Sequence, residues 1–488
     1  MTSTVSKAVR TFCLLLALML SLALFAGCKG EDKTTSSKDA ASDNYSGMEN
    51  TEVVEQFEDK DHPTLPKTKD LGGMEIVIAT GKLDMIMPEQ GTSAEGDLKL
   101  EALREVQKNY NCTISLSFVA TWEDAIASIL SGDQFANIVQ PCLHQSGAFI
   151  QSRVCADYLD PEISQYIDMD QPWWNDNMAY ASNVLGEVYC GASSLCAPAQ
   201  YTWIVYFNKA IAKDIGLGEN DLYDLVDKKE WTWDAMAKYA KLAVKDMDGS
   251  GAMDSDEDRW GFRSPGNDCA QAFTSTAKVA SITTDNGMNP RYTFNTEHAI
   301  STMTKLNAFF TTDGFFKETG VDTENSLFVA QYFKGIASEF RRNTEEEWGI
   351  LPMPLGPKEG GGWQDKYLSR VDHNSRSLII PATVEDKAST ALVLEALSFS
   401  FFRIINQEVE TMALSYLSDD KSIEIARNVY NTTTYEISQF MQGVGTYGST
   451  VERLVFRLHE VPNFDVSNSA VSVADQAQQM IDDYFNGL

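Results

Sequence analysis

The folded part of the chain shows two hydrophobic periodicities that alternate along the sequence. Residues 74–80 (MEIVIAT) form a short β-branched run, and residues 113–119 alternate apolar with polar positions, as strands do. Between them, residues 98–110 place apolar side chains on one helical stripe. Residues 121–140 then contain a second helical stripe followed by another buried run. This β-α-β-α-β order predicts a largely parallel sheet covered by helices.

A second α/β region begins near Tyr189. Its clearest strand is WIVYFNK at residues 203–209. Thr232 is a predicted N-cap, with Asp234 in the first turn and an apolar stripe over residues 236–244. Residues 258–262 (DRWGF) have the composition of a strand. The region therefore predicts a second sheet with its own helices.

The N-terminal 69 residues have a different pattern. Lys7 and Arg10 precede a short apolar run at residues 12–26, which is typical of a secretory signal peptide. Ala-Gly before Cys28 resembles a bacterial lipobox, so we expect Cys28 to carry lipid as the mature terminus after removal of residues 1–27. Residues 28–69 are polar and predict a disordered tether. Because no second apolar run is long enough to cross a membrane, the body is expected outside the cell, held to the membrane only by the lipid.

Length, charge and cysteine content narrow the class of protein. A chain of 488 residues predicts two or three domains after the tether. The formal net charge of −31 disfavours nucleic acids and anionic lipid headgroups as partners. No CxxC pair occurs, and six cysteines lie beyond Cys28. Export permits a disulfide between Cys190 and Cys196, although buried free thiols are expected for most of the six.

Residues 246–257 (DMDGSGAMDSDE) have the spacing of a calcium-binding loop. Such a loop takes oxygen ligands at its first, third, fifth, seventh, ninth and twelfth positions and needs glycine at the sixth. Gly251 stands at the sixth position, and the ligand positions hold Asp246, Asp248, Ser250, Ala252, Asp254 and Glu257. A calcium sensor needs a helix on both sides, whereas a strand is predicted after this loop. We therefore expect a structural Ca²⁺; an acidic surface turn without metal is the alternative.

No catalytic motif in the sequence indicates an enzymatic reaction. The chain has no GxSxG, HExxH, Walker A or dinucleotide-binding fingerprint, and its five histidines are scattered. The enzymatic alternative is a glycosidase, in which two carboxylates would meet in a cleft. No specific pair is indicated, so we expect no enzyme.

Aromatic residues carry more information about a ligand. Flat aromatic faces beside Asn and Asp suit sugars, which offer C–H faces for stacking and hydroxyls for hydrogen bonds. The sequence DQPWWND at residues 170–176 places two tryptophans in a polar loop. The predicted ligand-binding residues are Trp173, Trp174, Asp176, Trp203, Trp348 and Trp363.

Six sequence segments, in the same order as the motifs of the family, resemble the family 1 extracellular solute-binding proteins of ABC transporters. This family includes maltodextrin binders. The six segments are ILSGDQFANIVQP (129–141), VYFNKAIAKDIGL (205–217), WTWDAMAKYAKLA (231–243), FKGIASEF (333–340), GILPMPLGP (349–357) and SLIIPATVEDKASTALVLEALSF (377–399). The usual Pro-Asp of the first motif is replaced here by Ala136-Asn137. The resemblance extends from about Gly72 to the C-terminus.

The resemblance implies a two-lobed α/β fold of the type II periplasmic-binding-protein class, with a hinge of two or three strands. The expected division is residues 70–185 with about 325–372 in lobe 1, and residues 186–324 with about 373–488 in lobe 2. It further implies a monomer that captures a carbohydrate between the lobes and delivers it to the permease subunits of an ABC importer. A non-sugar solute such as a peptide, or a glycan-degrading enzyme, are the alternatives.

Overall fold

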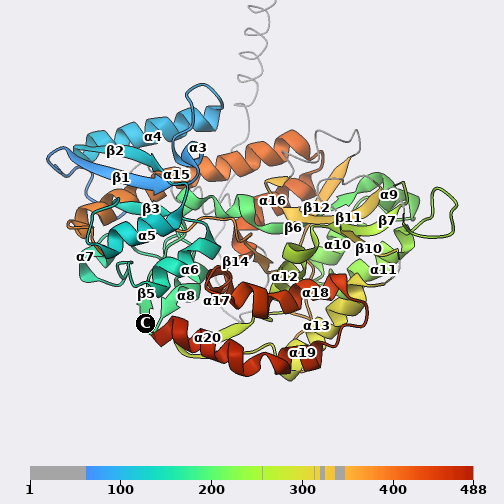
Figure 1. The fold of residues 1–488 in the computed structure, drawn as a ribbon. Coiled ribbons are helices and arrows are strands. Elements are labelled where there is room, and N and C mark those ends of the chain that lie inside the picture. Colours follow the sequence, from blue (N-terminus) through green and yellow to red (C-terminus); the bar gives the residue numbers. More distant parts are fainter. Residues whose placement is uncertain (1–61, 255–256, 313, 319–324, 336–346, 487–488) are drawn as a thin grey trace, which may run out of the picture. The chain divides into compact units, whose positions relative to one another are not determined.

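The computed structural model describes residues 62–254, 257–312, 314–318, 325–335 and 347–486, which belong to one compact unit, Gly47–Leu488 (Figure 1). Cys28 and the predicted signal peptide lie outside these residues. The first sheet has the order β2-β1-β3, formed by β1 (Met74–Thr80), β2 (Cys112–Phe118) and β3 (Ile138–Gln140). All its strands are parallel, and α4 (Ala94–Tyr110) and α5 (Trp122–Leu130) connect them. The predicted β-α-β-α-β order is confirmed.

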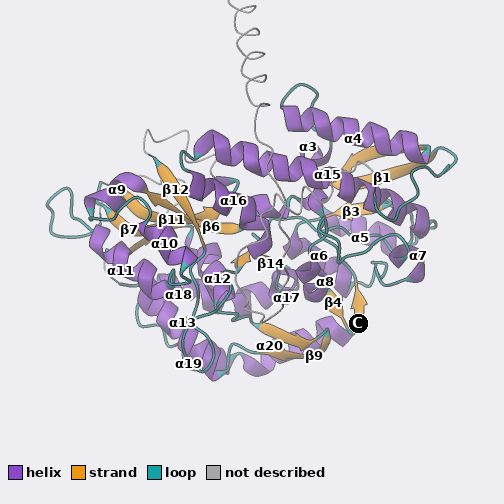
Figure 2. Ribbon diagram, turned by 180° about the vertical axis from the view of Figure 1, so that it is seen from behind, coloured by secondary structure: helices purple, strands orange, loops and turns teal. Residues whose placement is uncertain are grey.

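The second sheet has five strands and mixed directions. Its order is β10 (Phe316–Glu318), β7 (Trp260–Ser264), β11 (Ser326–Tyr332), β6 (Trp203–Asn208) and β12 (Trp348–Pro352). β7 is parallel to both β10 and β11, whereas β6 runs antiparallel to β11 and β12. The predicted strands at 203–209 and 258–262 thus lie in one sheet. The two sheets lie at opposite sides of the fold in both views (Figures 1 and 2).

The remaining elements surround these sheets. In the first half of the chain they are α3 (Leu83–Ile86), α6 (Leu143–Gln151), α7 (Pro161–Ser164), α8 (Asp176–Ala181), β4 (Asn183–Val184), β5 (Glu187–Val188), the 3-10 turns η1 (Ser194–Cys196) and η2 (Pro198–Tyr201), α9 (Lys209–Asp214), α10 (Asp221–Asp227) and α11 (Trp233–Ala243). The later ones are α12 (Gly266–Thr276), β8 (Ile282–Asp285), β9 (Met288–Tyr292), α13 (Glu297–Phe310), β13 (Ser369–Arg370), α15 (Lys387–Tyr416), α16 (Asp420–Thr432), β14 (Thr433–Thr434), α17 (Ile437–Met441), η4 (Gly448–Glu452), α18 (Arg453–Glu460), α19 (Val466–Ser472) and α20 (Ala474–Asn486). The Thr232 hydroxyl accepts a hydrogen bond from the Ala235 N–H, which confirms the predicted cap of α11.

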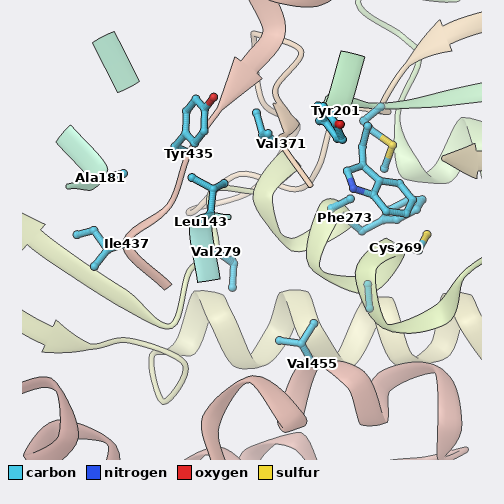
Figure 3. Packing of buried hydrophobic residues seen from close by; sticks show 14 of the residues in the cluster. Leu143, Ala181, Tyr201, Cys269, Phe273, Val279, Val371, Tyr435, Ile437 and Val455 are labelled. Carbon is cyan, nitrogen blue, oxygen red and sulfur yellow. The ribbon is translucent and has the colours of Figure 1, made fainter. Parts of the chain in front are cut away.

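Three hydrophobic clusters fill the space around the sheets. In β6, Trp203, Val205 and Phe207 face the largest cluster, while Ile204 and Tyr206 face a smaller one on the other side of the sheet. The largest cluster continues from the first sheet to the second, and Figure 3 shows Leu143 beside Val371 and Tyr435 within it. The two lobes therefore share a hydrophobic core.

Helix α15 belongs to both lobes. Its N-terminal part, through Ile405, packs in the cluster beneath the first sheet, and its C-terminal part, from Val409, packs in the cluster behind the second. α15 is also long and apolar enough to cross a membrane by length and composition, which the sequence pattern did not predict. Because 78% of its most apolar window is buried inside the fold, it has the environment of a core helix.

Two further connections cross between the sheets. Gly191–Tyr201 leaves the first lobe and leads into β6, and residues 370–378 return from the second lobe to the first. The returning segment pairs with Thr202 at Val371, and then with Gly191 and β3 at Leu378 and Ile379. Together with α15 it closes the hinge region between the lobes.

Three sequence predictions about the chain's organisation need correction. Residues 325–372 do not join the first lobe, because β11 and β12 both pair with β6 in the second sheet. Residues 376–405 do not belong to the second lobe, because they pair with β3 and pack beneath the first sheet. Residues 62–69 do not belong to the predicted tether, because Leu65 is buried in the first lobe and the Tyr110 hydroxyl donates to the Pro66 carbonyl.

Candidate ligand-binding site

Polar side chains from both lobes meet where the strands of the two sheets end. Gly81 follows β1, Cys142 follows β3, and Tyr332 ends β11. Ligands of open α/β sheets bind beyond the carboxyl ends of the strands, where loops diverge. The segment 370–376 crosses this region, bonded through Asp372 N–H to the Tyr201 carbonyl and through the Ser375 carbonyl to the Leu143 N–H. Any group on this segment therefore lies between the lobes.

Arg376 is the central group of this region. It lies opposite Cys142 in an antiparallel bridge, and its Nη1 is 3.4 Å from the position that a β-carbon at Gly81 would occupy. The residue is only 7% exposed, and its Nε is buried without a hydrogen-bond partner. Within the described residues, no carboxylate forms an ion pair with it. A buried N–H group without a partner is costly, so the environment of Nε calls for an acceptor.

Tyr201 lies near Arg376, and Tyr332 and Lys334 lie next to Tyr201. The rings of Tyr201 and Tyr332 have centroids 6.0 Å apart and are tilted by 31°, and Nζ of Lys334 lies 5.8 Å from the Tyr201 centroid. Burial raises the pKa of Tyr201 to about 12, against the opposing charge of Arg376. Burial and the nearby ammonium of Lys82 lower the pKa of Lys334. The cluster combines aromatic faces with cationic donors, which suits a polar ligand that carries rings.

A surface depression of about 630 Å³ opens beside this cluster. Lys82, Gln200 and Lys334 line it, together with side chains of α4 and α15. Two of its acidic residues are occupied by protein groups: Glu408 pairs with Lys99 at 2.6 Å and Glu95 accepts from the Thr411 hydroxyl. The depression is of the size expected for a small-molecule site.

A second polar group lies on the same crossing segment. Nδ1 of His373 is 3.3 Å from Oδ1 of Asp268, at the N-terminal turn of α12, and the His144 ring is 5.4 Å from the His373 ring. Burial alone would lower the pKa of His373, but the hydrogen bond to Asp268 and the charge of Asp372 raise it overall. Burial lowers the pKa of His144. Thus α6 of lobe 1, the crossing segment and α12 of lobe 2 converge here.

The tryptophans that were predicted to bind ligand do not lie together in one site. Trp173 is 0% exposed, and its indole nitrogen donates to Oε1 of Glu395 at 2.7 Å. Trp174 donates to Oε2 of the same carboxylate at 2.6 Å. Both rings therefore hold α15 against lobe 1 and have structural roles. Trp174 also borders an outer depression of about 400 Å³ together with the exposed Asp176.

The other predicted tryptophans are dispersed. Trp203 is 2% exposed and packs in the largest cluster, edge-on to Tyr332 at 6.5 Å. Trp348 begins β12 and is buried behind the second sheet. Trp363 is half-buried on the outer side of lobe 2, where Nζ of Lys305 lies 4.5 Å from its ring. The prediction that these rings face one ligand is wrong, because burial in separate clusters directs them apart.

The residues that do converge were missed, yet the sequence held a signal for them. Gly81, Cys142, Tyr201 and Asp268 all lie within a few residues of a strand end or start. A search at the ends of predicted strands, rather than among tryptophans, would have found them. Arg376 lacks such a signal, because its pairing with β3 joins segments more than 200 residues apart.

The acidic loop has the turn geometry that was predicted. Gly251 has a φ of +82°, which favours glycine, and Asp246 accepts hydrogen bonds from the N–H groups of Gly249 and Gly251. The carboxylates of Asp246 and Asp248 meet that of Asp258, which was not among the predicted ligands. Three carboxylates fit a hard cation such as Ca²⁺. Ser250, Ala252, Asp254 and Glu257 are exposed, and the Ca²⁺ itself stays a prediction.

The six described cysteines (Cys112, Cys142, Cys155, Cys190, Cys196 and Cys269) are buried and free. Burial raises the pKa of the Cys196 thiol to about 12. The suggested pairing of Cys190 with Cys196 is therefore absent here, and the expected buried thiols are found.

Comparison with solved structures finds the same fold at low sequence identity. The cyclic alpha-maltosyl-1,6-maltose binding protein from Arthrobacter globiformis matches with a TM-score of 0.57 and 12% identity, covering 85% of this chain and 100% of that one. The sugar-binding protein MalE from Xanthomonas citri matches with a TM-score of 0.56 and 10% identity, covering 84% and 97%. UgpB from Mycobacterium tuberculosis in complex with glycerophosphocholine matches with a TM-score of 0.52 and 14% identity, covering 84% and 98%. No protein-family model and no curated protein matches the sequence. The structural matches confirm the predicted two-lobed, type II periplasmic-binding-protein fold.

Proposed function

We propose that this chain is a solute-binding protein that captures a saccharide between its two lobes and delivers it to an ABC importer. The fold supports this proposal, since two of the similar structures are named as sugar-binding proteins. The observation that carries it is the convergence of Tyr201, Tyr332, Lys334 and Arg376 between the lobes. Tyrosine faces stack on sugar rings, and the cationic donors bind hydroxyl or acidic oxygens.

The same arrangement gives a mechanism of capture. Arg376 is tied to β3 of the first lobe, whereas Tyr201 leads into β6 of the second. A ligand that contacts both groups binds the closed form better than the open one, and so shifts the population toward closure. The permease subunits of the importer would then recognise the closed form. No step of this cycle changes a covalent bond, so we propose binding without turnover.

We also place the protein at the outer face of the cell membrane as a monomer anchored through Cys28. The lipobox-like Ala-Gly-Cys and the polar segment after it support this. The Cys28→Ala variant is expected to appear in the medium or to keep its signal segment. Fully processed Cys28→Ala protein that stays on washed membranes would rule out the lipid anchor.

Calorimetric titration with a panel of neutral and acidic oligosaccharides tests the binding function. We expect at least one saccharide to bind, and Tyr201→Ala to weaken it tenfold or more, because a stacked ring contributes about 1 kcal/mol beyond the area it buries. Tyr180→Ala, at an exposed position outside the site, is the control. Mass spectrometry of the recovered ligand should show no cleavage.

A wild-type protein that binds none of the panel would contradict saccharide capture. Screening a dipeptide set and glycerophosphodiesters in parallel identifies the non-sugar alternative. Equal affinity in the wild type and in Tyr201→Ala would remove this cluster from the site.

A further inference from the structure

We infer that the ligand of this site is an acidic saccharide whose carboxylate binds Arg376. This inference rests on the proposed function and names the ligand class of the same site. The crossing segment contains two buried arginines that differ in one respect. Arg370 has a protein partner, with Nη1 3.7 Å from Oε2 of Glu436. Arg376 forms no hydrogen bond or ion pair with any described residue through its side chain.

The nearest candidate partner is occupied elsewhere. Asp372 lies four residues before Arg376, but its Oδ1 accepts hydrogen bonds from the N–H and the amide nitrogen of Asn374, each at 2.9 Å. Its Oδ2 faces His373 at 4.0 Å. The Asp372 carboxylate is therefore engaged by Asn374 and His373. Among the described residues, no carboxylate forms an ion pair with the guanidinium, which is left for another acceptor.

Other cations gather around Arg376. Lys82 follows Gly81, the residue at which an added β-carbon would lie 3.4 Å from Nη1 of Arg376. The ammonium of Lys82 lies close enough to Lys334 to lower its pKa, after burial. Lys334 itself contacts the Tyr201 ring and has no carboxylate in ion-pair distance among the described residues. Carboxylates lie near this group as well, since the charges of Glu408 and Asp84 act to raise the pKa of Lys334. Arg376 itself forms no ion pair with a described carboxylate. Such a group attracts an anion over the short range that salt leaves unscreened.

The shape of the cationic group favours a carboxylate on a ring. A guanidinium binds a carboxylate through two parallel hydrogen bonds, which fixes its orientation. Tyr201 lies near enough for the charge of Arg376 to act on its pKa, and the partly exposed ring of Tyr332 lies 6.0 Å from the Tyr201 ring. A sugar ring can stack on such an aromatic face. A uronic acid residue joins a carboxylate directly to such a ring. Asp84 and Glu89 line the depression beside Lys82 and Lys334, and their charges oppose an anionic unit there.

The test compares pairs of oligosaccharides that differ only in the acidic group. Trigalacturonic acid and its carboxyl-reduced counterpart form one pair, and a glucuronate-containing trisaccharide with its reduced counterpart forms another. We expect the full-length wild-type protein to bind the acid of at least one pair ten times or more tightly than its neutral counterpart. This preference should decline as NaCl is raised from 50 to 500 mM.

Arg376→Gln should abolish the preference for the acid, so that the acid and its neutral counterpart bind this variant with similar affinity. Arg376→Lys should keep part of the preference, because an ammonium retains the charge but lacks the planar fork. Arg403→Gln, at an exposed position of α15, is the matched control and should change neither affinity. Because the Arg376 side chain has no protein partner among the described residues, its replacement should not lower the melting temperature; a structural arginine would lower it.

Three outcomes would overturn the inference. They are equal or tighter binding of the neutral member in every pair, a preference for the acid that survives in Arg376→Gln, and tighter binding of a sugar phosphate than of the uronate. A wild-type protein that binds only neutral sugars would overturn this inference but not the proposed function. A wild-type protein that binds no saccharide of either kind would overturn the proposed function itself.

Discussion

Nε2 of His62 lies 3.0 Å from Oε1 of Glu395, although 333 residues separate them in sequence. The same buried carboxylate accepts the indole hydrogens of Trp173 and Trp174. Three donors from two distant segments thus meet on one acceptor of α15. This cluster attaches the start of the folded chain and the Trp-Trp loop to the helix that spans both lobes.

Replacing Glu395 with Ala should destabilise the protein strongly. Two buried indole N–H groups would lose their acceptor, at about 1–3 kcal/mol for each group left without a partner. Urea denaturation should therefore show a decrease of several kcal/mol in the free energy of unfolding. Glu410→Ala, which removes an exposed pair with Arg427 at 2.6 Å, is the control and should cost less than about 1 kcal/mol. Equal losses in the two variants would contradict the role of Glu395.

The His373–Asp268 pair should stabilise the protein in a defined pH window. The pKa of His373 is raised in the folded state, so its contribution is complete below the ordinary pKa of 6.5 and is lost as pH rises through the raised value. Asp268 has a lowered pKa, so its contribution is present above 3.8 and is lost as pH falls through the lowered value. The pair therefore contributes most between about pH 4 and 6.5.

Melting temperatures of the wild type and His373→Gln, measured between pH 4 and 9, test this window. The difference should be largest near pH 5.5 and should shrink above neutrality. His144, whose pKa is lowered by burial and by the charge of His373, should be replaced by Gln in both proteins so that its own titration does not enter the difference. A difference that does not depend on pH would refute the ion pair.

Truncation of Trp203 should destabilise the protein much more than truncation of Trp363, although both were predicted to bind ligand. Trp203→Ala leaves a cavity in the largest cluster and should lower the free energy of unfolding by about 3–5 kcal/mol. Trp363→Ala, at a half-buried position on the outer side of lobe 2, should cost much less. Denaturant titration measures both. A folded Trp203→Ala protein of wild-type stability that fails to bind saccharide would restore Trp203 to the ligand site.

Calcium should raise the melting temperature if the acidic loop holds the ion. An ion present at 100 times its dissociation constant stabilises the folded state by about 2.7 kcal/mol, or a few degrees for a chain of this size. Asp248→Asn should remove the response, because its exposed carboxylate is one of the three that converge. Glu257→Gln, the predicted twelfth ligand, is the comparison.

An identical melting curve in EDTA and in calcium would show that the loop is an acidic turn without metal. Loss of saccharide binding on chelation, in a protein that stays folded, would instead connect the ion with the ligand site. The loop follows α11 and precedes β7 in the second lobe, so we expect saccharide affinity to be unchanged.

Local elements could be predicted because neighbours in sequence determine them. The run at residues 74–80 coincides with β1, and the Thr232 cap starts α11 where the pattern placed it. The side-chain oxygen of Thr232, the stripe after it and Gly251 in its turn all act within a few residues. Such local signals do not depend on the tertiary contacts of the element.

Lobe boundaries and site residues depend on pairings between distant segments. β11 inserts between β7 and β6, and residues 376–381 lie beside β3, but neither pairing has a local signal. Trp173 and Trp174 looked available for a ligand because their loop is polar. Their acceptor, Glu395, lies in an apolar helix more than 200 residues later. Composition alone could not reveal that partner.

The continuity of α15 restricts how the lobes can separate. Because α15 packs against both lobes, rotation of one lobe relative to the other must either bend the helix or make it slide along one of the lobes. Ser398 and Ser400 each donate a hydrogen bond to the carbonyl four residues earlier, at 2.8 Å, which is a contact that bends helices. They lie in the part of the helix that precedes its change from the first lobe's cluster to the second lobe's. On the proposed function, release of a ligand would therefore strain α15, and we expect the stiffness of this helix to limit how far the lobes separate.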